Sequence, residues 1–74
     1  MMHKLDATGL SCPLPVLRAK KALRELKPGD SLEVRATDPA APKDFEAFCE
    51  TTRTVLDSVT QEGAVFVIVI RKPT

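Results

Sequence analysis

Apolar and polar residues alternate along this chain in segments that predict six short elements. Leu32, Val34 and Ala36 occupy every second position, which indicates a strand with one buried face. Apolar positions three or four residues apart instead predict helices. Together with the intervening turn residues, these periods predict strands at residues 3–7, 32–37, 55–61 and 64–71 and helices at residues 13–26 and 42–52.

The predicted order of strand, helix, strand, helix, strand, strand is typical of an α/β (α+β) two-layer sandwich. Crossovers between parallel strands are right-handed, which places both helices on one face of the sheet. We therefore expect a mixed four-stranded sheet with two helices packed on one face, formed by residues 1–74 as a single domain. If the first two strands are parallel, the loops around Cys12 and Asp38 lie close together.

The run from Val65 to Ile70 departs from strict alternation because all of its residues are apolar. The face of the sheet opposite the helices would be bare, so one side of this run has no helix to cover it. A central strand has such a composition, and so does a strand that associates weakly with a second copy. The sequence does not separate these two interpretations.

Composition and charge narrow the classes of function. Eleven Lys and Arg residues face ten Asp and Glu residues, which gives a net charge of +1, and Trp and Tyr are absent. Direct nucleic-acid binding is therefore not expected, because it depends on a basic surface and often on stacked aromatic residues. Bases cluster in residues 18–27 and acids in residues 38–50, a distribution that favours transient docking to proteins.

The sequence also predicts a cytoplasmic protein without a membrane segment. No signal peptide is visible, and the longest apolar run, residues 64–70, is too short to cross a bilayer as a helix. Reducing conditions would keep Cys12 and Cys49 as thiols. These cysteines form no Cys-x-x-Cys pair, so neither a thioredoxin-like motif nor a metal site is expected.

The segment Cys12-Pro13-Leu14-Pro15 contains the predicted catalytic residue, Cys12. Proline is tolerated in the first turn of a helix, so the two prolines predict a rigid helix start with Cys12 at the cap position. The N–H group of Leu14 would then point at the sulfur, and the helix dipole would favour a thiolate. The pKa of Cys12 is expected to fall from ~8.5 to roughly 7–8. A lone cysteine more often packs as a small hydrophobe, but the helix-start position favours a reactive thiol.

The first helix is expected to have a core-facing stripe and an exposed flank. The stripe consists of apolar residues at helical spacing, namely Val16, Ala19, Leu23 and Leu26. Leu14 and Leu17 fall outside it and indicate either loose packing at the helix edge or an apolar rim for a docking partner. The bases beside them form either a solvated face or part of that docking surface, and they are Arg18, Lys20 and Lys21.

Two further residues are interpreted from their local patterns. Cys49 lies at helical spacing from Phe45, which predicts a core position rather than a second reactive thiol. Asp38 precedes Pro39, an arrangement typical of a turn or a helix cap. The alternative role of Asp38 is to orient partners at the edge that contains Cys12.

These residues together resemble the TusA family of sulfur carriers, also called SirA-like or YedF-like proteins. The resemblance rests on segments spread over nearly the whole chain, at residues 5–10, 12–15, 37–39, 48–49 and 70–72. It implies a two-layer sandwich in which the cysteine matching Cys12 accepts sulfane sulfur from a cysteine desulfurase or a rhodanese. The sulfur would then pass to a downstream thiol acceptor protein, and the family implies no metal and no organic cofactor.

One segment departs from the family. Many relatives contain Gly followed by His or Asn after the second helix, where this chain has Thr51-Thr52-Arg53. The cysteine is unaffected, but the choice of partner can differ. Different members of the family serve tRNA thiolation, molybdenum cofactor chemistry or sulfur oxidation, and this departure leaves the tRNA-thiolation role unassigned here.

Two alternatives from other functional classes stay open at the level of sequence. A non-catalytic RNA-binding or regulatory module would use the bases of residues 18–24. A protein-interaction subunit would dock through Leu14, Leu17 and the apolar strand at residues 64–71. Both alternatives predict binding that does not depend on Cys12.

Overall fold

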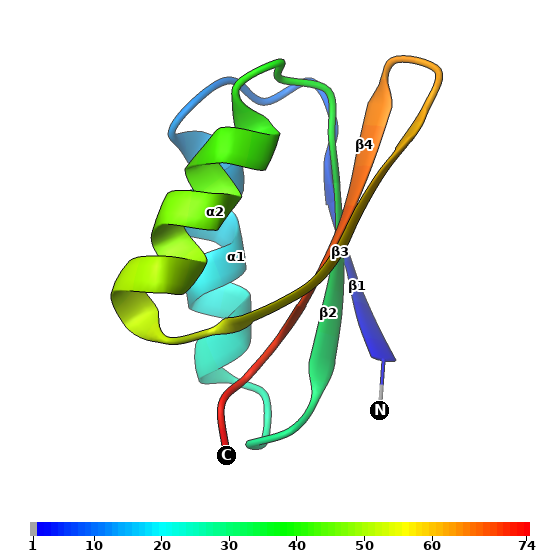
Figure 1. Cartoon of the computed structure of the whole chain (residues 1–74). Helices are drawn as coiled ribbons and strands as arrows, with labels where there is room; N and C mark the ends of the chain where they lie inside the picture. The colour runs from blue at the N-terminus through cyan, green and yellow to red at the C-terminus, as the bar shows by residue number, and fades with distance from the viewer. Residues whose placement is uncertain (1) are drawn as a thin grey trace.

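All six predicted elements are present in the structure, a computed structural model that describes residues 2–74 (Figure 1). The strands are β1 (Met2–Ala7), β2 (Ser31–Ala36), β3 (Val55–Glu62) and β4 (Val65–Arg71), and the helices are α1 (Leu14–Arg24) and α2 (Ala41–Thr52). Each boundary lies within two residues of the sequence prediction. The largest change is in α1, which begins at Leu14 rather than Pro13 and ends at Arg24 rather than Leu26.

The sheet is mixed and has the strand order β1-β2-β4-β3. β1 and β2 are parallel, whereas β4 pairs antiparallel with both β2 and β3. Both helices cover the same face of this sheet, so the predicted two-layer sandwich is confirmed (Figure 1). Because β4 lies between two other strands, the interpretation of its apolar run as a central strand is also confirmed.

The hydrophobic core lies between the helices and the sheet. Its largest side chain is Phe45 of α2, which is fully buried. Around Phe45 the core gathers apolar side chains from both inner strands and from α1, among them Leu32, Val34, Ile68, Ile70 and Ala19. Apolar side chains of Phe45's size bury enough surface to account for much of the stability of so small a domain.

Helix α1 faces the sheet through a slightly different line of residues from the predicted one. Pro15, Ala19 and Leu23 are buried, and their spacing of four residues places them in one row along the helix. Val16 and Leu26, predicted to lie on the stripe, are only half-buried against the core. Among residues 2–74, no helix is long and apolar enough to cross a membrane.

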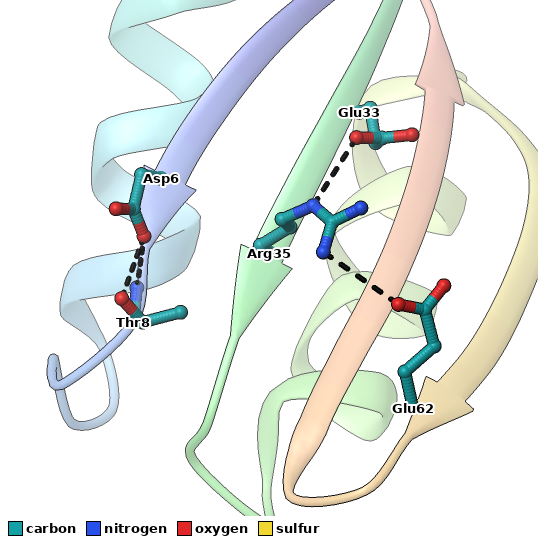
Figure 2. Close-up of polar contacts among 5 residues, drawn as sticks. All are labelled: Asp6, Thr8, Glu33, Arg35 and Glu62. Atoms are coloured by element: carbon teal, nitrogen blue, oxygen red, sulfur yellow. Dashed lines mark hydrogen bonds and ion pairs between the residues drawn. The ribbon is translucent and has the colours of Figure 1, made fainter.

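No helix of residues 2–74 covers the second face of the sheet, as expected, and polar side chains lie across that face instead (Figure 2). Nε of Arg35 donates to Oε2 of Glu33 at 3.4 Å, and Nη1 of Arg35 lies 3.7 Å from Oε1 of Glu62. Val67 of β4 pairs with Arg35 on one side and Thr60 on the other, and it is only 6% exposed. The long side chain of an arginine can cover an apolar neighbour while its charge stays in water.

The register of the strands shows which residues lie at each end of the sheet. At one end, Met2 pairs with Ser31, which pairs with Arg71. At the other end, Ala7 pairs with Ala36. The loops that follow β1 and β2 therefore leave the sheet together, at the end away from the first residue of β1 and the last residue of β4 (Figure 1). The turn after β1 is held by Thr8, whose N–H and hydroxyl both donate to Asp6 (Figure 2).

Candidate functional site

Two loops meet beyond the parallel strands, one after β1 and one after β2. The N–H of Gly9 donates to Oγ1 of Thr37 at 2.9 Å, and the N–H of Cys12 donates to Oδ2 of Asp38, also at 2.9 Å. Gly9 has a φ of +79°, a backbone conformation that residues with a Cβ adopt rarely. The predicted proximity of the Cys12 and Asp38 loops is confirmed.

Asp38 forms the predicted turn but does not cap α2. Its carbonyl oxygen accepts a hydrogen bond from the N–H of Ala41 at 3.0 Å, which closes the turn before the helix. The cap residue of α2 is Ala40, and no side chain caps this end. The Asp38 carboxylate instead reaches across to the backbone of Cys12, so its charge lies beside the candidate site.

The start of α1 differs from the prediction by one residue. Pro13 is the cap residue, and Cys12 precedes it through a cis peptide bond. The N–H of Leu14 donates to the carbonyl oxygen of Ser11 at 2.9 Å and is not available to the sulfur. The helix amide that was expected to stabilise a thiolate is therefore satisfied by the backbone of the preceding turn.

The surroundings of Cys12 raise its pKa, so the predicted fall is wrong. Cys12 is exposed and free, and its thiol lies beside the Asp44 carboxylate of α2. Sγ of Cys12 and a carboxylate oxygen from each of Asp38 and Asp44 all lie within 4.8 Å of one another. The polar interaction with the Asp44 carboxylate, the loss of hydration and the negative charges of Asp44 and Asp38 all favour the neutral thiol, which raises the pKa of Cys12.

Cys12 lies at one end of a groove between α1 and α2. The groove has a volume of about 420 Å³, and its walls are largely apolar. The lining residues on the α1 side are Cys12, Pro13, Val16, Leu17 and Lys20, and those on the α2 side are Asp44, Ala47, Phe48, Thr51 and Thr52. Open, apolar grooves beside a reactive group are suited to receive a side chain or a short segment of another molecule.

The predicted docking residues are only partly brought together. Leu14 is 42% exposed and Leu17 is 52% exposed, as expected for a rim, and Leu17 lines the groove. Lys20 also lines the groove, whereas Arg18 and Lys21 are exposed on α1 outside it. The rim beside Cys12 is therefore Leu14, Leu17 and Lys20, which we call the α1 rim.

Sequence reasoning missed the α2 side of the site. Asp44 lies within 4.8 Å of the sulfur of Cys12, and Phe48 forms part of the groove, but the sequence pattern marked neither as a site residue. A usable signal existed, because Asp44 is the acidic residue in the first turn of α2. The parallel crossovers bring that turn to the same end of the sheet as Cys12.

Cys49 has none of the properties of a reactive thiol, which confirms its predicted core position. It is 5% exposed and packs in the hydrophobic core. Burial raises its pKa to about 11, because a thiolate would lose its hydration there. Cys12 is therefore the exposed cysteine of the pair.

The cluster of Cys12, Asp38 and Asp44 supplies donor atoms of the kind that metals bind. Exposed acidic groups often gather without a metal, and the Asp38 carboxylate already accepts the N–H of Cys12. We assign no metal to this cluster.

The family model described as "Sulfurtransferase TusA" matches residues 3–72, a stretch that includes Cys12, Asp38 and Asp44. The chain belongs to the TusA family. A TusA-family protein 49% identical over 70 residues is the sulfur carrier protein TusA of Allochromatium vinosum, with 95% of this chain and 92% of the relative covered.

Two further comparisons agree with this family assignment. A candidate sulfur carrier protein of Neisseria meningitidis serogroup A is 55% identical over 67 residues, which cover 90% of each chain. The crystal structure of a SirA-like protein from Desulfitobacterium hafniense has a TM-score of 0.83 and 28% identity, and the match covers 100% of both chains. The TusA relatives support a sulfur carrier role in general, which implies donor and acceptor proteins for the sulfur.

Proposed function

We propose that Cys12 carries sulfane sulfur as a persulfide between a donor protein and an acceptor protein. The donor is a cysteine desulfurase or a rhodanese, and the acceptor is a downstream protein with a reactive thiol. The observation that carries this proposal is the position of Cys12, an exposed free thiol at the end of a groove, in a chain whose other cysteine is buried. A carrier of this kind needs a reduced thiol, so we propose the cytoplasm as its compartment.

The proposed reaction consists of two thiol exchanges. The Cys12 thiolate attacks the outer sulfur of the donor persulfide, so a new S–S bond forms on Cys12 and the donor's S–S bond breaks. The donor cysteine leaves as a thiolate, and Cys12 becomes a persulfide. An acceptor thiolate then attacks the outer sulfur of Cys12 in the same way. Each step moves one sulfur atom and needs no external oxidant.

Loading of the unmodified protein tests this proposal. After incubation with a cysteine desulfurase and L-cysteine, we expect the intact protein to gain one sulfur atom. After the free thiols are blocked by alkylation, trypsin separates the two cysteines into peptides 5–18 and 44–53, so the added sulfur can be located by mass spectrometry. Sulfur on peptide 5–18 supports the proposal, whereas no gain, or sulfur on peptide 44–53, would contradict it.

The donor is proposed to dock on the α1 rim. Leu17 is the more exposed of the two leucines of that rim, and it lines the groove that leads to Cys12. Substitution of Leu17 by Glu should lower the rate of sulfur loading by about tenfold, because a charge placed in the docking contact must be desolvated, and each ~1.4 kcal/mol of lost docking free energy corresponds to a factor of ten. The measurement is the initial loading rate at a donor concentration well below saturation.

A matched control is offered by Val59→Glu. Val59 lies on the edge strand β3 and is 39% exposed, so it resembles Leu17 in character but does not line the groove. This variant should load at the rate of the unmodified protein. Equal loss in both variants would show that an added charge, rather than the α1 rim, slows the reaction.

A further inference from the structure

We propose that Asp44 is the proton acceptor for Cys12 during sulfur transfer, an inference that rests on the proposed persulfide chemistry. Asp44 is the fourth residue of α2, and one of its carboxylate oxygens lies within 4.8 Å of Sγ of Cys12. Both residues line the same groove. A general base takes its proton directly or through one water molecule, and this separation allows Asp44 to do so.

The two neighbouring carboxylates have different tasks. Oδ2 of Asp38 is engaged by the backbone N–H of Cys12, which holds the loop. Among residues 2–74, the carboxylate of Asp44 takes part in no ion pair. Asp44 also lines the groove with Cys12, whereas Asp38 does not. Asp44 therefore faces the space through which a donor sulfur would approach.

The same carboxylates favour the protonated thiol in the unloaded carrier. The carboxylates of Asp44 and Asp38 oppose formation of a third negative charge, and the charged residue that α1 contributes to the groove is Lys20. A protonated thiol reacts slowly with small electrophiles. Transfer from a docked persulfide is different, because the proton can pass to Asp44 as the new S–S bond forms.

In the proposed reaction, Asp44 ends each transfer in the protonation state in which it began. The Asp44 carboxylate takes the proton of the Cys12 thiol, and the resulting thiolate attacks the outer sulfur of the donor persulfide. The donor's S–S bond breaks, and its cysteine leaves as a thiolate. The protonated Asp44 then gives its proton to that thiolate. The net change is one sulfur atom moved from donor to Cys12, so the donor cysteine ends as a thiol, Cys12 ends as a persulfide, and Asp44 ends as a carboxylate again.

The variant Asp44→Asn tests whether Asp44 accepts the proton of Cys12 or affects the thiol only through its negative charge. The variant removes a negative charge and a base together, so the two thiol reactions should change in opposite directions. Alkylation of Cys12 by iodoacetamide at pH 7 should become several times faster, and its pH profile should shift to lower pH. Single-turnover sulfur transfer from a loaded desulfurase should become roughly 10²-fold slower, the lower end of the usual effect of a general base.

Two variants serve as controls. Glu46→Gln removes the same charge from α2, but Glu46 is exposed and does not line the groove, so both rates should stay unchanged. Asp44→Glu keeps a carboxylate and should restore most of the transfer rate even if Asp44→Asn folds poorly. If both rates rise in Asp44→Asn, or if Asp44→Glu transfers no faster than Asp44→Asn, the proposal is overturned. Failure of the unmodified protein to load would instead contradict the proposed function itself.

Discussion

Replacement of Cys12 by serine is expected to abolish sulfur loading. A serine hydroxyl has nearly the volume of a thiol but is not ionised near neutral pH and does not accept sulfane sulfur, so no persulfide can form at this position. Cys12 is exposed, and no core packing depends on it, so the variant should fold as the unmodified protein does. The measurement is the intact mass after incubation with a desulfurase and L-cysteine.

Cys49→Ala is the matched control for this experiment. Cys49 is buried with a pKa of about 11, so its removal should leave loading unchanged at a temperature where the variant is folded. Full loading of Cys12→Ser, or a complete loss of loading in folded Cys49→Ala, would show that the sulfur is not carried by Cys12.

Truncation of Phe45 to alanine is expected to have the largest effect on stability. Phe45 is fully buried and is the largest of the fully buried side chains. Removal of a buried phenylalanine side chain typically costs about 3–5 kcal/mol, because apolar contacts are lost and a cavity remains. A domain of this length has a free energy of unfolding of about 4–11 kcal/mol. The substitution should therefore remove a large part of the stability and lower the melting midpoint by more than roughly 10 °C.

The absence of Trp and Tyr decides how this prediction is measured. Intrinsic fluorescence gives little signal, so urea unfolding is best followed by far-UV circular dichroism. Val59→Ala is the comparison, because Val59 is partly exposed on β3 and its truncation should change the free energy of unfolding by no more than about 0.5 kcal/mol. Similar losses in the two variants would mean that Phe45 is not the centre of the core.

The fold could be predicted from the sequence because the spacing of apolar residues clearly distinguishes strands from helices. Alternating residues such as Leu32 and Val34 define a half-buried strand, and the handedness of crossovers then places both helices on one face. The apolar run of β4 was ambiguous, because composition does not reveal the order of strands in a sheet. Its neighbours β2 and β3 settle that it is an inner strand.

The candidate site could be located from the sequence, but its electrostatics could not. The prolines beside Cys12 marked a helix start, and the loop did prove to be exposed. The expected fall in pKa assumed that the helix end is the main influence on the sulfur. The structure adds Asp44, 32 positions later in the sequence, and its carboxylate reverses the direction. Contacts of this kind depend on tertiary packing, which local patterns do not contain.

The ends of the chain and the Cys12 loop lie at opposite ends of the sheet, which has a practical consequence. β1 begins and β4 ends in the row of Met2 and Arg71, and the loop with Cys12 leaves from the far row. The length of β1 places these rows about 17 Å apart. A tether, an affinity handle or a fluorophore fused before β1 or after β4 would thus lie at the end of the sheet opposite Cys12. Protein immobilised in this way should leave Cys12 accessible to a donor or acceptor protein.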